Sequence, residues 1–155
     1  MFGRLILILP FPQICVAPDY VLIPRSAQDA FVEAVKEAAA ELHLDDALTS
    51  DSYGSIVSDG HYKRLRNLMT KSSGEIVVGG DTDEEKRRIT PTVYRDVKEG
   101  DSLLEGYSTF LSTRGLDSLC LLILLTCKTS EIFGPLLPIV PVDDIRGAIE
   151  YVNAQ

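Results

Sequence analysis

Three cysteines and two histidines are the side chains of this sequence best suited to nucleophilic or metal chemistry. The cysteines are Cys15, Cys120 and Cys127, and the histidines are His43 and His61. A cysteine acts as a nucleophile when its thiol pKa is lowered or when a base takes its proton. Neither histidine has a partner at the spacing of a metal-binding motif, so we expect no metal site.

Cys15 lies between a proline-rich apolar run and a predicted strand, in the segment PFPQICVAPDYVLIPR (10–25). Residue types alone leave two interpretations open, a small buried apolar side chain or a catalytic nucleophile. A thiol-protease pair of Cys15 with His61 is a third, but such motifs do not transfer between families, and no other residue supports it. On the same reasoning Glu131 would be a surface carboxylate and Phe133 a core aromatic residue.

Composition and charge narrow the class of protein. A chain of 155 residues with 45% apolar and 25% charged residues suits one soluble globular domain with its own core. The net charge of −8 argues against a nucleic-acid partner and against a polybasic membrane contact. Two basic clusters, Lys63–Arg66 and Lys86–Arg88, are expected to be solvated surface.

The cysteine count and the apolar runs bear on location. Three widely spaced cysteines do not form a secreted disulfide framework, so we expect a reducing, cytoplasmic location. The apolar run 5–9 is cut by Pro10 and Pro12, which argues against a signal peptide. The run 119–127 is about half the length that spans a bilayer, so no transmembrane helix is predicted.

Apolar periodicity predicts an α/β domain. Strands are expected over 20–23, 75–78, 89–97 and 136–142, with helices starting near 26, at 58 or 59, and at 143 or 144. Ser26–Asp29 fits a capping box, and prolines 138 and 141 favour an irregular or edge position for the last strand. The expected inner faces of the helices are Phe31, Val32, Val35, Ala38, Ala39 and Leu42, then Tyr62, Leu65, Leu68 and Met69, and finally Ile145, Ala148, Ile149 and Val152.

The segment QICVAPDY (13–20) resembles the nucleophile segment of aldehyde dehydrogenases, in particular the class 3 and fatty-aldehyde branch. The similarity continues in YGSIVSDGHYKRLRNLM (53–69), VVGGDTDEEKRRITPTVYRDV (77–97) and EIFGPLLPIVPVDDIRGAIEYVNA (131–154). These blocks have the order and spacing of the family, except around 106–130, and CVAPDY together with EIFGP is a specific pair. The resemblance implies a partial aldehyde dehydrogenase catalytic domain with a layered α/β/α fold.

The resemblance also implies roles for three residues. Cys15 matches the catalytic cysteine, whose thiolate attacks the aldehyde carbonyl to form a thiohemiacetal; hydride then passes to NAD or NADP, and water hydrolyses the resulting thioester. Glu131 matches the glutamate that binds the nicotinamide ribose, and Phe133 the aromatic residue beside the nicotinamide half. The implied partners are an aldehyde substrate and, as in other family members, a second subunit.

Two stretches depart from the family pattern. Residues 1–12 have no family counterpart, and 106–130 interrupts the matched parts 13–105 and 131–155. We interpret both as retained introns or gene-model errors, which transcripts from the locus would test. The family's phosphate-binding loop, general-base glutamate, oxyanion-holding asparagine and oligomerisation segment match nothing in this sequence.

These departures predict a chain that is inactive by itself and marginally stable. Lost sheet neighbours would leave edges and apolar faces open. The alternative to an enzyme is a non-catalytic truncated product that binds a full-length homologue, or the product of a pseudogene.

Overall fold

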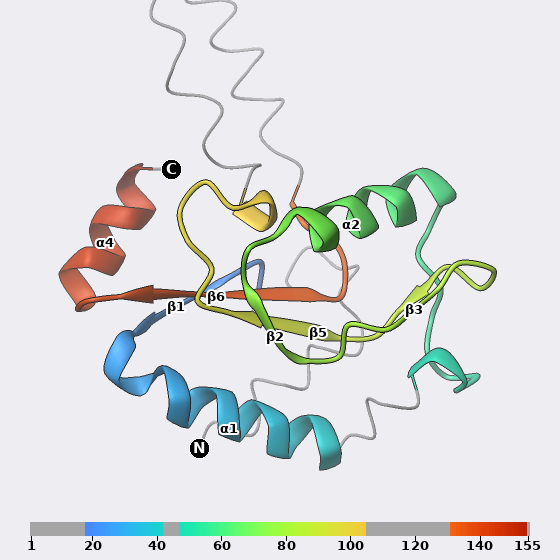
Figure 1. The fold of residues 1–155 in the computed structure, drawn as a ribbon, viewed down its shortest axis with the longest axis horizontal. Coiled ribbons are helices and arrows are strands. Elements are labelled where there is room, and N and C mark those ends of the chain that lie inside the picture. Colours follow the sequence, from blue (N-terminus) through green and yellow to red (C-terminus); the bar gives the residue numbers. More distant parts are fainter. Residues whose placement is uncertain (1–17, 42–46, 105–130, 155) are drawn as a thin grey trace, which may run out of the picture.

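Four strands form the central sheet of the structure, a computed structural model that describes residues 18–41, 47–104 and 131–154 (Figure 1). Their order is β1, β6, β5, β2, and their bounds are Val21–Pro24, Leu136–Val142, Thr92–Arg95 and Glu75–Val78. Strands β1, β6 and β5 are parallel, and β2 is antiparallel to β5. The strands β3 (Thr82–Asp83) and β4 (Arg88–Ile89) form a separate antiparallel hairpin.

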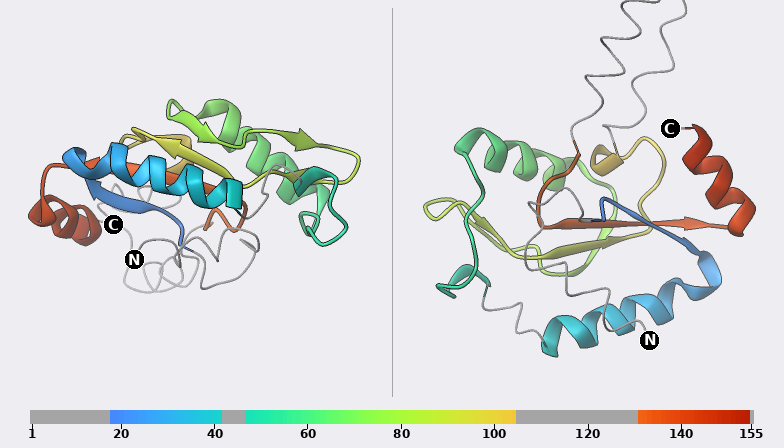
Figure 2. Two further views of the ribbon diagram at one scale, coloured as in Figure 1. Left: turned by 90° about the horizontal axis from the view of Figure 1, so that it is seen from below. Right: turned by 180° about the vertical axis from the view of Figure 1, so that it is seen from behind.

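Helices cover both faces of this sheet, which confirms the predicted α/β layering (Figures 1 and 2). Helix α1 (Arg25–Glu41) covers one face, and α2 (Asp59–Lys71), the 3₁₀ turn η3 (Ser102–Leu104) and α4 (Ile145–Ala154) lie on the other. The core under α1 consists of Val32, Val35, Ala38, Val93, Leu137 and Ile139. The core on the other face consists of Ile56, Tyr62, Leu65, Ile89, Tyr94, Val97, Leu103, Leu104, Ile132, Leu136 and Val140.

The starts of the first two helices test the predicted boundaries. The N-cap of α2 is Ser58, whose Oγ accepts a hydrogen bond from the His61 N–H at 3.2 Å, in agreement with the predicted start at 58 or 59. Helix α1 begins at Arg25, so Ser26 lies inside its first turn, and the capping-box prediction is wrong. The inner face of α2 is confirmed, since Tyr62 and Leu65 are buried in the core.

The last helix matches its predicted start but not its predicted inner face. Asp144 caps it by accepting a hydrogen bond from the Gly147 N–H at 2.9 Å. Ile145, Ile149 and Val152, predicted to face inward, are 75%, 55% and 52% exposed. Helix α4 lies at one end of the sheet beside β1 and β6 (Figure 1), and Tyr151 is the side chain that packs against the core, with its ring edge to face on Tyr20.

Strand β6 is central in the sheet, so the predicted edge position is wrong. Its two prolines are tolerated because each half of the strand pairs with a different neighbour. Residues 136–138 pair with β5, and residues 139–142 pair with β1. The strand predicted over 89–97 is divided into β4 and β5, and Pro91 lies between them, where it donates no ladder hydrogen bond.

Gly79 turns the chain after β2, as the Gly79–Asp81 pattern predicts. Its φ is +71°, in the left-handed region that favours glycine. A Cβ at this position would lie 2.1 Å from the carbonyl oxygen of Pro91, so the two chain segments approach closely here only because the residue has no side chain.

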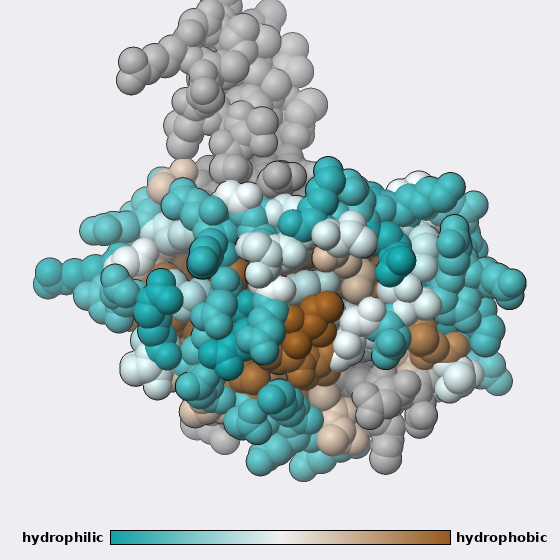
Figure 3. Space-filling view, in the orientation of Figure 1, coloured by the Kyte–Doolittle hydropathy of each residue, from teal (hydrophilic) through white to brown (hydrophobic). Residues whose placement is uncertain are grey.

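Apolar surface is exposed on the edge strand β2 as well as on α4. Ile76 is 45% exposed, and Figure 3 shows an apolar patch over this part of the molecule. None of the described helices is both long enough and apolar enough to cross a membrane.

Asp101 joins the end of α2 to the turn η3. Its carboxylate accepts hydrogen bonds from the Ser73 N–H at 2.8 Å, the Ser73 hydroxyl at 2.9 Å and the Leu103 N–H at 3.0 Å. Burial raises the pKa of this carboxyl, but the hydrogen bonds from Leu103 and Ser73 outweigh burial and hold it below its ordinary value of 3.8.

We expect Asp101→Asn to remove stability that exists only while the carboxylate is ionised. Because the folded-state pKa lies below the unfolded one, this stability is present above about pH 4 and is lost as the pH falls through the folded-state value. Urea unfolding should give a gap of about 1 kcal/mol between parent and variant at pH 7, from the weaker bonds of a neutral acceptor. The gap should shrink at pH 3; a gap independent of pH would contradict this account.

Candidate active site

Two of the three predicted site residues lie in the loop that leads into β6. This loop, Glu131–Pro135, carries Glu131 and Phe133 and is called the EIFGP loop below. The third predicted residue, Cys15, lies outside the described residues. Its catalytic role and the cofactor roles of the other two stay predictions.

The EIFGP loop contacts the segment that precedes β1. Strands β1 and β6 pair in parallel, with Val21 opposite Ile139. The segments that lead into the two strands therefore lie at the same end of the sheet. The Ile132 N–H donates a hydrogen bond to Asp19 Oδ1 at 3.0 Å. Asp19 follows Cys15 by four residues in the sequence, so this bond holds the chain just beyond the CVAPDY cysteine against the EIFGP loop.

Helix α2 binds the same loop from the other side through its side chains. Arg64 Nη2 donates hydrogen bonds to the carbonyl oxygens of Glu131 at 2.8 Å and Ile132 at 2.5 Å. His61 Nε2 is 2.7 Å from the carbonyl oxygen of Phe133. Three consecutive carbonyls of the loop are therefore held by one face of α2.

Sequence reasoning missed these anchors. It placed Arg64 in a solvated basic cluster, and this is wrong, because the side chain is half-buried against the loop. The available signal was helical spacing, since His61, Arg64 and the core residue Leu65 share one face of α2. That spacing does not reveal which distant segment the face contacts.

Charge at this junction is partly buried. Burial raises the pKa of Asp19, and the charge of Glu131 raises it further, whereas the bond from Ile132 and the charge of Arg64 oppose the shift. Burial lowers the pKa of Arg64, with Asp19 opposing. The second carboxylate oxygen of Asp19 is buried and has no hydrogen-bond partner among the described residues.

The side chains of Glu131 and Phe133 remain open to a ligand although their backbone is held. The Glu131 carboxylate is exposed and makes no hydrogen bond to a described residue. The Phe133 ring is 37% exposed and meets the His61 ring edge to face at 6.3 Å. A free carboxylate fits ribose hydroxyls and an exposed ring fits a flat heterocycle, so both fit the nicotinamide half of NAD or NADP.

Gly134 allows the loop to approach α2 closely. A Cβ at this position would lie 2.6 Å from Leu65 Cδ1, and Leu65 is 0% exposed. The loop backbone is therefore packed directly against the core side chain that lies next to Arg64 in the sequence.

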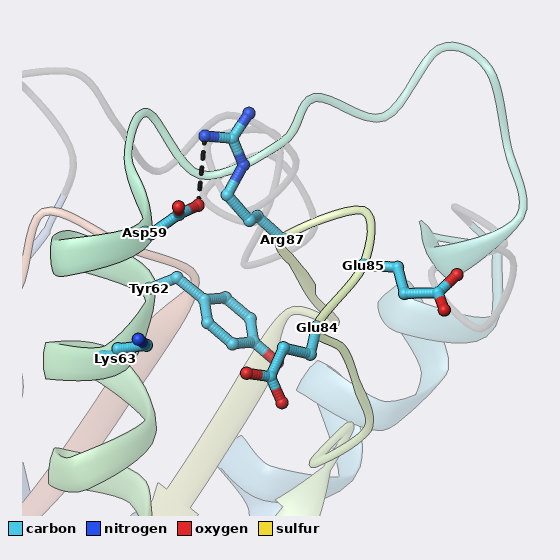
Figure 4. A pocket seen from close by; sticks show the side chains of 6 residues that line it. All are labelled: Asp59, Tyr62, Lys63, Glu84, Glu85 and Arg87. Carbon is cyan, nitrogen blue, oxygen red and sulfur yellow. Dashed lines mark hydrogen bonds and ion pairs between the residues drawn. The ribbon is translucent and has the colours of Figure 1, made fainter.

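A hollow of about 300 Å³ lies elsewhere, between α2 and the turn of the β3–β4 hairpin (Figure 4). It is lined by Asp59, Tyr62, Lys63, Glu84, Glu85 and Arg87. Arg87 pairs with Asp59 at 3.4 Å, so part of the charge is internally neutralised. Neither Glu131 nor Phe133 lines this hollow, and across 18–41, 47–104 and 131–154 no group of three or more acidic, histidine or cysteine residues is arranged to hold a metal.

Comparison with known proteins identifies relatives in one family. Residues 12–106 match the aldehyde dehydrogenase family model. Aldehyde dehydrogenase family 3 member B1 of Bos taurus is 37% identical over 141 residues, which cover 91% of this chain and 25% of the relative. Family 3 member A2 of Rattus norvegicus is 31% identical, over 91% of this chain and 24% of its own length.

Solved structures agree with the sequence matches. The substrate-bound AldH of Staphylococcus aureus has a TM-score of 0.76 at 28% identity, covering 97% of this chain and 28% of that one. The Mycobacterium tuberculosis aldehyde dehydrogenase complexed with NAD+ has a TM-score of 0.62 at 24% identity, covering 97% and 29%, which shows the shared fold.

The matches also show how much of a whole family member this sequence covers. The chain spans about a quarter of the length of the curated relatives that it matches. Its sandwich of helices on a largely parallel sheet has the same fold as part of the solved enzymes. The chain thus belongs to the aldehyde dehydrogenase family, is similar to members of its family 3, and covers part of the catalytic domain.

Proposed function

We propose that this chain supplies the cysteine nucleophile and the nicotinamide-side contacts for the oxidation of an aldehyde to a carboxylic acid with NAD or NADP. The observation that carries the proposal is the hydrogen bond from the Ile132 N–H to Asp19. It joins Asp19, four residues beyond Cys15 in the sequence, to Ile132, which lies between Glu131 and Phe133. The two motifs of the proposed site are therefore neighbours in space although more than a hundred residues separate them.

The proposed chemistry assigns one task to each residue. The Cys15 thiolate attacks the aldehyde carbonyl and holds the substrate as a thiohemiacetal. Bound NAD or NADP would supply the acceptor for the hydride that leaves this adduct. Cys15 then carries the oxidised substrate as a thioester until water releases the acid, while Glu131 binds ribose hydroxyls and Phe133 packs beside the nicotinamide.

The substrate class and the setting follow from the resemblance. We propose medium- or long-chain, aromatic or apocarotenoid-like aldehydes as substrates, and the cytoplasm as the location. Because the chain spans about a quarter of its relatives, we expect no complete turnover from these 155 residues alone. An assay of NADH formation with a panel of aldehydes, alongside Cys15→Ala, tests this; turnover that depends on Cys15 would contradict the expected inactivity.

We expect the chain to bind nicotinamide mononucleotide in preference to adenosine monophosphate. Glu131 and Phe133 are proposed to contact only the nicotinamide half of the cofactor. Nicotinamide mononucleotide is that half, and adenosine monophosphate is the half that these residues do not contact. Saturation-transfer NMR should show transfer to the nicotinamide and ribose protons. Glu131→Gln should weaken binding about fivefold, since an amide oxygen accepts weaker hydrogen bonds than a carboxylate.

Glu150→Gln is the matched control for this measurement. Glu150 is an exposed carboxylate on α4 outside the EIFGP loop, so its variant should bind like the parent chain. Equal binding of adenosine monophosphate, or binding indifferent to Glu131, would refute the proposed contact.

A second candidate is a non-catalytic role, in which the chain docks on a full-length homologue. The exposed apolar residues Ile145, Ile149 and Val152 favour it, because a helix face of this kind is normally covered. Co-purification with a co-expressed family 3 homologue would support this candidate. If the two proteins do not co-purify, the docking role is refuted and the enzymatic role is favoured.

A further inference from the structure

We infer that Arg64 and His61 are positioning residues, which hold the EIFGP loop so that the Glu131 carboxylate and the Phe133 ring face the nicotinamide half of the cofactor. The inference rests on the proposed function, because it assumes that those two side chains contact the cofactor. Two residues of α2, distant in sequence from the loop, thereby direct both contacts through the backbone.

The hydrogen bonds fix three consecutive peptide units. Arg64 holds the carbonyls of Glu131 and Ile132, and His61 holds the carbonyl of Phe133. Phe133 lies between two of these peptide units, so its Cα–Cβ direction is fixed, and the Cα of Glu131 is attached to the first of them, which fixes its place. Neither α2 residue contacts the Glu131 carboxylate, which leaves that group available.

The backbone conformation of Phe133 requires such anchors. Its φ is +46°, a left-handed value that costs free energy in a residue other than glycine. Conformations of this kind persist where surrounding contacts over-determine them, and they concentrate at ligand-binding sites. Here the carbonyl of Phe133 is bound by His61 and its ring packs against the same imidazole.

Arg64 and His61 also act on each other. His61 Nε2 faces a carbonyl, which only accepts, so Nε2 carries the proton. Arg64 Nε lies 3.5 Å from His61 Nδ1, where the unprotonated nitrogen of that tautomer accepts from the guanidinium. The two side chains therefore form one unit that a single substitution disrupts.

The loop is clamped from its other sides too. Asp19 accepts from the Ile132 N–H, and Gly134 packs against Leu65. If the Arg64 bonds were lost, Asp19 would be the described side chain that still forms a hydrogen bond to residues 131–132. We therefore expect Arg64 substitutions to loosen the loop locally without unfolding the sheet.

Hydrogen exchange in the 155-residue chain, without ligand, tests the anchoring. Arg64→Met should speed exchange of the Ile132 amide by about tenfold or more, because the lost charge-assisted bonds lower the free energy of local opening. Amides of β5 and β6 should keep the parent rates. Arg66→Met removes the same charge from an exposed position on α2 and should change neither. Equal exchange in the two variants would overturn the inference.

The imidazole gives a spectroscopic signature. Long-range ¹H–¹⁵N NMR at pH 8.5 should show His61 as the Nε2–H tautomer in the parent chain, with His43→Gln assigning the signal. Arg64→Met should mix the two tautomers, and Arg66→Met should not. An Nδ1–H tautomer in the parent chain would overturn the inference, since Nε2 would then have no proton for the Phe133 carbonyl.

Binding of nicotinamide mononucleotide tests the link to the cofactor. Arg64→Met should weaken it at least as much as Glu131→Gln does, because the Phe133 contact is released as well. The double variant should lose less than the sum of the two single losses, because Arg64 acts through Glu131 and its loop. Arg64→Lys should recover part of the loss, and His61→Gln, which keeps an N–H donor, should bind better than His61→Phe.

The outcomes separate the inference from the function on which it rests. No binding by the parent chain would refute the proposed cofactor contact, and with it the inference. Binding that Arg64→Met leaves unchanged would refute only the positioning role, as would independent, additive losses in the double variant.

Discussion

Replacing Cys15 by alanine is expected to abolish the acylation of this chain by p-nitrophenyl acetate. In the parent chain the Cys15 thiolate attacks the ester carbonyl, p-nitrophenolate leaves, and an acetyl thioester remains until water hydrolyses it. Alanine has no nucleophile, so p-nitrophenolate release should fall to the background rate, which absorbance measures directly. The reaction needs no cofactor, so it tests the nucleophile separately from Glu131 and Phe133.

The other two cysteines supply matched controls. Cys120→Ser and Cys127→Ser should keep the p-nitrophenolate release of the parent chain, and tandem mass spectrometry should locate the acetyl group on the peptide containing Cys15. Acylation that survives in Cys15→Ala, or an acetyl group found mainly on Cys120 or Cys127, would show that Cys15 is not the activated thiol.

Replacing Leu65 by alanine is expected to lower the free energy of unfolding by about 2–5 kcal/mol, the usual cost of removing a buried leucine side chain. Leu65 is 0% exposed and belongs to the core beneath α2, where it also meets the EIFGP loop. For a chain predicted to be marginally stable, this loss should leave a large unfolded fraction. Urea titration followed by far-UV circular dichroism measures it.

Two further variants show whether the loss comes from this contact. Leu68→Ala, on the same helix but only partly buried, should cost less. Gly134→Ala alone should cost about 1–3 kcal/mol by overpacking against Leu65. In the double variant the added methyl group enters the space that Leu65 vacates, so the two losses should sum to more than the measured one; strict additivity would contradict the contact.

Local patterns in the sequence predicted most elements of the fold. The helix starts at 58 or 59 and at 143 or 144 and the strand Glu75–Val78 were all confirmed, because a helix start or an apolar repeat depends on residues within one turn or one strand. The pair of motifs CVAPDY and EIFGP was likewise sufficient for the family, which the comparisons confirmed.

The sequence did not determine what each face of an element contacts. The periodicity of α4 identified an apolar face, but the position of the helix beside β1 leaves that face exposed. Prolines favoured an edge position for β6, yet the strand is central because its halves pair with different neighbours.

The sequence alone therefore determined the family, the order of the elements and the residues that match the family's site motifs. Only the tertiary structure revealed that Arg64 and His61 hold the loop of Glu131 and Phe133. Those hydrogen bonds join residues 67, 68 and 72 positions apart, and no local pattern carries that information. They form because the parallel pairing of β1 with β6 and the packing of α2 on the sheet bring α2 and the EIFGP loop together at one end of the sheet.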